Sequence, residues 1–227
     1  MPAGLRVIGD HTIAQIDETY RNLVFKSKST LTMDTTLITG TSIYGGNFNV
    51  TADTYPFLAV RSSAKVSFAG FTKSGSTYTM YYFTDTSGAS VEWYHFDTPT
   101  TGETTNYLAI YDSAAQLVYN ALDKAMIITD FKACSNTTYT GTSGRKYAGM
   151  QTAQGYAERE RAPAGMGTGS FRSWQPYQTW SSDIAGTFSG NLFSNGLVIE
   201  DVNVGAVDRD EGNQANTKFL IVDVTGL

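Results

Sequence analysis

The chain has 227 residues, enough for one large all-β domain or two small ones with a sizeable buried core. Charged residues make up 16% of it, the net charge is −5, and no three basic residues follow one another, which argues against a nucleic-acid-binding surface. No apolar run approaches the ~20 residues of a membrane helix, so we expect no membrane span.

The rest of the composition favours β-structure. Aromatic residues reach 13%, with 14 tyrosines, and Thr, Tyr, Phe and Val favour strands while Gly, Asn, Asp and Ser favour turns. Low charge with many hydroxyl groups is shared by secreted β-proteins, capsid proteins and viral fibres. The opening residues MPAGL lack the basic and apolar regions of a signal peptide. We therefore expect synthesis in a cytoplasm, without Sec-dependent export.

In chain order, residues 12–25 fit helical and alternating spacing about equally, and we predict a strand there. Residues 31–96 alternate Thr, aromatic and aliphatic residues, and Gly-containing turns are predicted at Lys73–Gly75 and Thr86–Gly88. This part predicts a series of hairpins. Residues 97–106 form a polar loop.

Residues 107–131 predict three short strands, with turns at 112–115 and 120–124. The segment 134–183 changes character and becomes rich in Gly, Ser and aromatic residues towards its end. From residue 184 the strand pattern returns, and Asn195-Gly196 is the strongest candidate for a two-residue hairpin turn.

About ten to twelve short, evenly spaced strands indicate an all-β fold, an antiparallel β-sandwich or a jelly-roll-like arrangement with little helix. We expect a single domain over residues 1–227, with a sub-boundary near 134–183.

Few residues offer chemistry. His11 and His95 lie far apart and in no metal-binding spacing, so no metal site is predicted. Cys134 is the only cysteine, which excludes an intrachain disulfide, and we interpret it as a small buried residue. No cofactor motif stands out, and we expect that the protein is not an enzyme.

Two alternatives involve sugars. A glycosidase needs two carboxyl groups across a cleft, and Glu92, Glu158 and Asp183 are candidates that the sequence cannot pair. For surface recognition, the aromatic residues that could stack on a sugar ring are Trp93, Trp174, Tyr177 and Trp180. The competing interpretation is that these rings fill the core or an interface.

Three stretches resemble small virion proteins encoded in the tail modules of tailed bacteriophages. Residues 1–25 resemble their opening Gly-Leu-x-Val strand, turn and Gln-Ile-Asp strand. Residues 109–112, 116–119 and 126–130 resemble a middle signature of a strand pair followed by a third strand, and GRKYAGMQ at 144–151 falls where such proteins have a Gly-Arg-Lys-Tyr-Ala strand. Ala115 stands where a turn glycine is usual, and Ala125-Met126 where an arginine-containing strand is usual.

The resemblance implies a structural component of the distal tail tip or a tail fibre, located in the virion and acting by assembly and host-surface contact. The expected partners are other phage tail proteins, further copies of the chain with a trimer as the favoured arrangement, and a host cell-surface glycan or pilus. The alternative function is a glycan-binding or glycan-depolymerising receptor-binding protein of the virion.

Overall fold

The computed structural model describes the backbone of residues 4–8, 13–17, 23–36, 43–52, 54–99, 109–111, 114, 117–120, 122–152, 156–160, 169–199 and 218–227. Side chains are described over the same ranges except at 4–8, 13–17, 156–160, 169–175 and 190–199.

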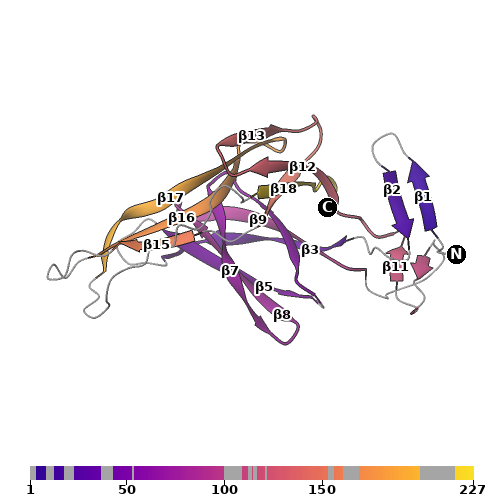
Figure 1. Ribbon diagram of the computed structural model, residues 1–227, viewed down its shortest axis with the longest axis horizontal. Coiled ribbons are helices and arrows are strands. Elements are labelled where there is room, and N and C mark those ends of the chain that lie inside the picture. Colours follow the sequence, from indigo (N-terminus) through magenta and orange to yellow (C-terminus); the bar gives the residue numbers. More distant parts are fainter. Residues whose placement is uncertain are drawn as a thin grey trace.

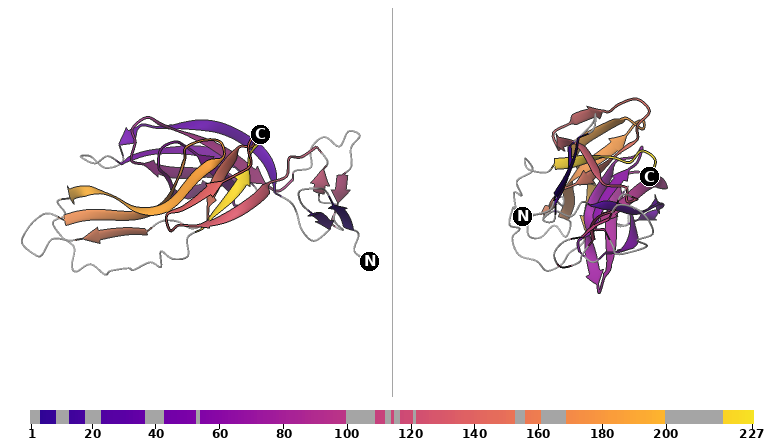
Figure 2. Two further views of the ribbon diagram at one scale, coloured as in Figure 1. Left: turned by 90° about the horizontal axis from the view of Figure 1, so that it is seen from above. Right: turned by 90° about the vertical axis from the view of Figure 1, so that its right-hand side faces the viewer.

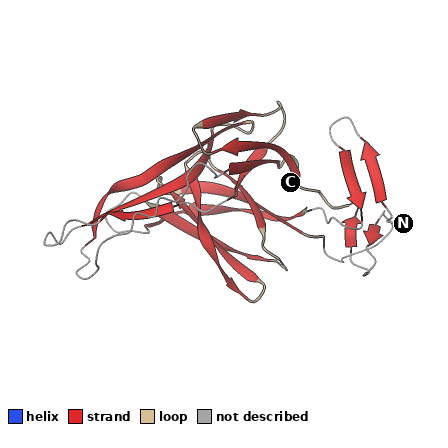
Figure 3. Cartoon of the chain, viewed as in Figure 1, coloured by secondary structure: helices blue, strands red, loops and turns tan. Residues whose placement is uncertain are grey.

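The described residues form strands, turns and loops without a helix, and two antiparallel sheets make up the main body (Figures 1 and 3). The six-stranded sheet has the order β12 (Ile127–Ala133), β18 (Lys218–Asp223), β14 (Tyr147–Gln151), β6 (Phe57–Arg61), β9 (Ala89–Asp97) and β3 (Val24–Met33). The eight-stranded sheet has the order β13 (Thr137–Thr140), β17 (Ala185–Ile199), β16 (Gly169–Trp180), β7 (Val66–Ser74), β8 (Thr77–Thr84), β5 (Tyr44–Thr51) and β4 (Thr35–Thr36), and β15 (Tyr156–Glu160) pairs with β16. The prediction of an all-β, sandwich-like fold is confirmed.

The core follows from strand alternation, because successive side chains point to opposite faces of a sheet. On β9, Val91 and Trp93 face the eight-stranded sheet and pack with residues such as Val50 and Met80. A second interior cluster, which includes Trp180, Phe188 and Ile221, packs β13, β16 and β17 against β14 and β18. These two clusters hold the sheets together.

The outer face of the six-stranded sheet has a core of its own. Tyr94 and Phe96 of β9 pack there with Ala148 and Val222 of neighbouring strands. Partly buried apolar residues cover them, among them Leu23, Phe25, Met126 and Leu227. The central strands are therefore apolar on both faces, as expected for strands buried on both sides.

Two small sheets lie beside the main body (Figures 1 and 2). One pairs β1 (Gly4–Ile8) with β2 (Ile13–Asp17), and the other pairs β10 (Ala109–Tyr111) with β11 (Leu117–Asn120). Strands β2 and β11 lie close together, although about a hundred residues separate them in the chain. Two stretches that carry the family resemblance therefore meet at one end of the molecule.

The three strands predicted in 107–131 all form, but they do not make one sheet. β10 and β11 pair with each other, whereas β12 is an edge strand of the six-stranded sheet. Of residues 144–151, where the resemblance implies a strand, Tyr147–Gln151 form β14. The segment 134–183, where a sub-boundary is predicted, supplies strands to both sheets.

Three local predictions need correction. Residues 12–25 do not form one strand, since β2 ends at Asp17 and β3 begins at Val24. The turn at Thr86–Gly88 leads from β8 into β9, which belongs to the other sheet, so it is not a hairpin turn. Asn195-Gly196 makes no hairpin either, because β17 runs through it and pairs with β16 on both sides of a register shift.

In the part of the chain that the structure describes, no helix is long and apolar enough to cross a membrane.

Candidate functional site

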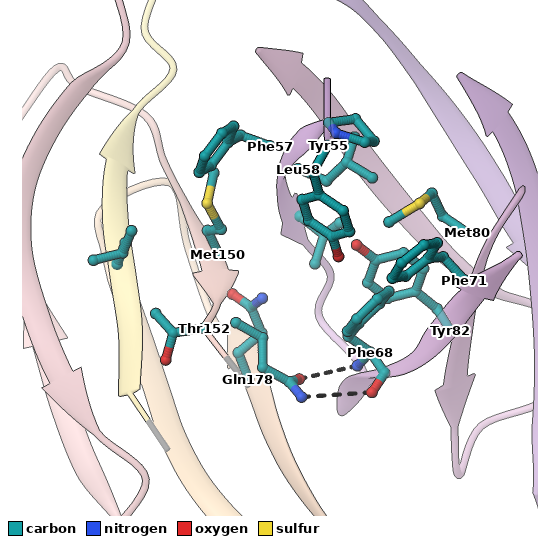
Figure 4. A pocket seen from close by; sticks show the side chains of 14 residues that line it. Tyr55, Phe57, Leu58, Phe68, Phe71, Met80, Tyr82, Met150, Thr152 and Gln178 are labelled. Atoms are coloured by element: carbon teal, nitrogen blue, oxygen red, sulfur yellow. Dashed lines mark hydrogen bonds between the residues drawn. The ribbon is translucent and has the colours of Figure 1, made fainter. Parts of the chain in front are cut away.

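An apolar cleft of about 470 Å³ opens where β6 diverges from β14 and β7 diverges from β16, each pair being joined by a single described bridge (Figure 4). One wall comes from β14, β16 and β18, and the other comes from β6, β7 and β8. The lining includes Leu58, Met80, Met150 and Leu220, together with several aromatic rings. Cavities of this size and polarity are typical of sites that bind small molecules or single side chains.

Aromatic rings stand at the rim of the cleft. Tyr55 is 42% exposed and Phe71 is 44% exposed, and their ring centroids lie 4.9 Å apart at 73°. Pro56 follows Tyr55 and restricts it to extended backbone, directly before β6 begins at Phe57. Edge-to-face packing therefore holds two large rings in contact with both solvent and the cleft.

The amide groups near the cleft connect the two sheets. The Gln151 Oε1 atom of β14 accepts a hydrogen bond of 3.0 Å from the backbone N–H of Phe68 on β7 (Figure 4). The buried Gln178 side chain of β16 donates to the carbonyl of Gly149 at 2.8 Å and accepts from Trp180 Nε1 at 2.9 Å. These bonds occupy the amides in linking strands of the two sheets.

Tyrosines are the titratable side chains that line this cleft. Burial raises the pKa of Tyr55, with a smaller contribution from neighbouring Tyr78, and burial also raises the pKa of Tyr82. Both phenols are therefore protonated at neutral pH and can donate hydrogen bonds, but they do not act as bases. The cleft can hold an apolar or ring-shaped group.

Of the four aromatic residues predicted to recognise a ligand at the surface, two are buried. Trp93 is 9% exposed and stacks on Phe48 with a centroid distance of 4.4 Å and an interplanar angle of 3°. Trp180 is 2% exposed, and its Nε1 is bound by Gln178. Surface stacking does not fit these two rings, because almost all of their surface is buried.

The other two candidates, Trp174 and Tyr177, both lie on β16. Tyr177 is half-buried on β16, and the Nζ atom of Lys65 lies 5.5 Å from its ring centroid. The backbone of Trp174 lies in β16 opposite Leu192 of β17, and its side chain lies outside the described residues.

The structure connects two of the predicted carboxylates through one arginine. Arg61 Nη2 lies 2.9 Å from Asp183 Oδ1, and Arg61 Nε lies 3.5 Å from Glu92 Oε2. Lys146 Nζ lies 2.8 Å from the same Glu92 oxygen, and the Tyr94 hydroxyl donates to it at 3.1 Å. Arg61 is the last residue of β6, Glu92 lies within β9, and Lys146 directly precedes β14. Asp183 lies between β16 and β17. The cluster lies beside Trp180, whose ring centroid is 5.8 Å from the guanidinium carbon of Arg61.

The electrostatics of this cluster disfavour general-acid chemistry at Glu92. Partial burial raises the pKa of Glu92, but the hydrogen bond and charge of Lys146, with help from Tyr94 and Arg61, outweigh burial and lower it. A glycosidase acid needs a raised pKa so that it stays protonated. Glu158 lies on β15, and its side chain is outside the described residues.

His95 lines a second, polar cavity of about 390 Å³ with Lys26, Asn49 and Asp97. Its side chain is buried, and its Nε2 atom has no hydrogen-bond partner among the described residues. Burial lowers the pKa of His95, against the opposing charge of Asp97, and Lys26 lowers it further. His11 lies outside the described residues, among which no three His, Cys, Asp or Glu side chains gather in a metal-binding group.

Cys134 lies in the turn between β12 and β13 and is half-buried. Burial raises the pKa of its thiol to about 11. Little of it is therefore thiolate, the nucleophilic form, at neutral pH.

The outer edge of the six-stranded sheet carries exposed apolar side chains. β12 pairs with β18, and the structure describes no strand on its other side. Ile127, Ile128 and Phe131 are all exposed, and Phe131 reaches 60%. An edge strand with large exposed apolar side chains is typical of a surface that contacts another chain.

Sequence reasoning missed both the cleft rim and this edge. Tyr55 and Phe71 have the same sequence context as the buried aromatic residues around them. The sequence did contain a signal for β12. Adjacent Ile127 and Ile128 point to opposite faces of the strand, so both faces of this edge strand are apolar. The core can bury only one of these faces, and the other has to be buried by a further contact.

Comparisons of the chain with models of protein families, with curated proteins and with solved structures find no match.

Proposed function

We propose that this protein is a structural component of a bacteriophage tail, at the distal tip or in a fibre, and that it acts by assembly and host-surface contact. The supporting observation is β12, an edge strand with exposed Ile127, Ile128 and Phe131. This strand overlaps the last part of the signature that resembles phage tail proteins, Met126–Asp130. Assembly through β12 gives that signature a physical role.

Two further features fit this proposal. The chain is poor in charged residues, and the Glu92 carboxylate is held by Lys146 and Arg61. The second small sheet, β10–β11, lies beside β2 and so adds a separate face near one end of the molecule. A protein that works through surface contact needs such faces more than it needs a reactive group. Its partners would be other tail proteins and copies of itself, with a trimer as the arrangement that the resemblance implies.

The test uses virions of the phage that encodes this chain. Mass spectrometry of purified particles is expected to find the protein, and gold-labelled antibodies are expected to bind at the tail end. An antibody against the major capsid protein is the control for labelling position. Detection in the cell lysate but not in purified particles would contradict the proposal.

A second candidate function is glycan recognition, favoured by the exposed rings of Tyr55 and Phe71 at the rim of the cleft. Exposed aromatic faces bind the apolar faces of sugar rings. Calorimetric titration with host lipopolysaccharide is expected to give heat of binding that Tyr55→Ala or Phe71→Ala abolishes. Tyr81→Ala is the matched control, because Tyr81 is exposed on β8 and does not line the cleft.

A depolymerase would instead depend on its carboxylates. Viscosity of host polysaccharide is the measurement, and the variant is the triple substitution Glu92→Ala, Glu158→Ala and Asp183→Ala. Unchanged activity in this variant would exclude these residues, and no activity in the natural protein would exclude the depolymerase.

A further inference from the structure

The β12 strand has one open hydrogen-bonding side. It pairs with β18 from Ile127↔Asp223 to Ala133↔Lys218, with a register shift between Ile128 and Asp130. Its other side faces no strand among the described residues. A further strand would pair with backbone N–H and C=O groups on that side. The Met126 N–H, directly before β12, already donates to the Leu23 carbonyl at 2.7 Å. The Phe131 N–H donates to Asp130 Oδ1 at 2.7 Å, so a strand that pairs at Phe131 has to replace this bond.

The side chains of β12 around Phe131 differ by face. Asp130 and Lys132 share one face, and Lys132 Nζ lies 2.7 Å from Asp130 Oδ2 and 5.8 Å from the Tyr139 ring centroid. Phe131 points to the opposite face, where its cross-strand neighbour is Leu220. The order is therefore acid, aromatic, base along three consecutive residues.

This order is self-complementary in one arrangement. When two such strands run antiparallel with Phe131 opposite the partner's Phe131, Asp130 lies opposite the partner's Lys132, and Lys132 lies opposite the partner's Asp130. Side chains directly opposite on antiparallel strands have Cβ atoms about 5 Å apart, close enough for ion pairs. The two aromatic rings meet on the other face.

We propose that a second copy of this chain pairs with β12 in this register, about a two-fold axis at Phe131. The inference rests on the proposed assembly function and specifies one contact of it. The two six-stranded sheets would become one continuous sheet across the pair, and Phe131 would lose much of its exposure.

The choice of a second copy follows from the charges. A strand of another protein would need a matching acid and base, whereas this strand already carries both, in the spacing that pairs with itself. The β3 edge offers no such match, because its ten residues include Lys26 and Lys28 but no carboxylate. An antiparallel pair of β3 strands would place lysines near lysines and gain nothing from charge.

The contact is isologous, so it closes at two copies. It therefore differs from the threefold arrangement that the family resemblance implies, and a trimer would need other surfaces. A single pair of short edge strands is a small interface, and such interfaces bind weakly. The association is best measured over a wide range of protein concentration.

The experiment exchanges the charges one at a time and then mixes the products. Sedimentation equilibrium of the natural chain from about 1 to 500 µM is expected to show a monomer–dimer equilibrium. Asp130→Lys alone and Lys132→Asp alone each place like charges opposite one another and are expected to weaken the dimer roughly tenfold. An equimolar mixture of the two variants restores both cross-strand pairs, so it is expected to dimerise as the natural chain does.

The mixture separates this contact from loss of folding, because neither variant regains its own ion pair on mixing. Lys28→Asp on β3 is the matched control and is expected to leave the dimer unchanged. A natural dimer without rescue in the mixture would overturn the register while leaving the assembly function standing. A natural chain that stays monomeric, or that grows beyond dimers without limit, would overturn the contact itself, and virion labelling decides the assembly function independently.

Discussion

The two edge strands of the six-stranded sheet, β3 and β12, expose different kinds of side chain. β3 and β12 are the outer strands of this sheet, and both contain a register shift. The start of β3 meets the residues directly before β12 in one isolated bridge, Val24↔Ala125. Beyond that bridge, neither strand has a partner strand on its outer side among the described residues. On β3 the exposed side chains are Lys28, Ser29, Thr30 and Thr32, all polar. On β12 they include Ile127, Ile128 and Phe131.

The difference shows that geometry alone does not make an interface. Charged and hydroxyl-bearing side chains keep an open edge hydrated, because pairing with another strand would cost the free energy of removing their bound water. Large apolar side chains reverse this balance, since burying them is favourable. From the same sheet, β3 is therefore expected to stay solvated, whereas β12 is expected to be covered in the assembled state.

The largest expected effect tests the sheet that carries both edges. A Cβ atom on Gly149, in β14, would lie 2.0 Å from Gln178 Oε1 and 3.1 Å from Phe188 Cε1. Gly149→Ala would force Gln178 from its bonds with the Gly149 carbonyl and Trp180 Nε1, and should lower the free energy of unfolding by about 3 kcal/mol. Urea unfolding followed by tryptophan fluorescence measures the change.

Gly75→Ala is the control for this variant. Gly75 has a φ of +61° in the β7–β8 turn, and nothing lies within 4 Å of its added Cβ. It should cost only the backbone strain, about 1–2 kcal/mol. Equal losses of unfolding free energy in the two variants would show that the clash with Gln178 adds nothing to the cost of a Cβ atom at Gly149.

The next largest effect separates the two edges directly. Phe131→Asp removes the most exposed aromatic side chain from β12 and places a charge there, whereas Thr30→Asp places the same charge on β3. Removal of a central aromatic contact costs about 2 kcal/mol of association, or roughly thirtyfold. We expect this loss for Phe131→Asp in sedimentation equilibrium, and no change for Thr30→Asp. Equal losses would mean that the two edges do not differ.

The strands themselves were largely predictable, but their partners were not. Alternation and the turns at Lys73–Gly75 and Thr86–Gly88 predicted β7, β8 and β9, and Gly75 and Gly88 have positive φ in the structure. Local pattern does not state which sheet a strand joins, so the passage from β8 to the opposite sheet was missed. Asn195-Gly196 shows the converse, because pairing with β16 along most of β17 overrides a strong local turn preference.

The candidate site was harder to predict than the fold. A tryptophan between polar residues suits both a core and a binding surface, and burial depends on the opposite sheet, which supplies Phe48 for Trp93. The Arg61 cluster was also hidden, since its members come from residues 61, 92, 146 and 183. Of these four residues, the sequence indicated Glu92 and Asp183 as candidates, but it did not indicate Arg61, the residue that binds both.

A smaller effect concerns acid stability next to β3. His95 pairs with Ser27 of β3, and burial lowers its pKa in the folded protein, opposed by Asp97 and reinforced by Lys26. The unfolded chain therefore binds more protons at this site than the folded chain, so stability falls as the pH drops through 6.5, the ordinary pKa, towards the lower folded value.

Urea unfolding at a series of pH values measures this dependence. His95→Gln is expected to flatten the curve in that window, while His11→Gln, at the other histidine, serves as the control. A curve that His95→Gln leaves unchanged would assign the acid sensitivity to other groups.

The smallest effect is expected from a substitution that gives β3 an exposed aromatic side chain like that of β12. Thr30 is exposed near the middle of β3, so Thr30→Phe gives that edge an aromatic side chain without disturbing the core. One aromatic cross-strand pair contributes about 0.5–1 kcal/mol, so at most a severalfold gain in association is expected, measured in a Phe131→Asp background that silences β12. Thr30→Val is the matched control for added apolar area without a ring. If Thr30→Phe associates as strongly as the natural β12, exposed aromatic area alone makes the interface, and the charges of Asp130 and Lys132 are dispensable. If it gains little, the acid and base on either side of Phe131 are what distinguish an assembly edge from a solvated one.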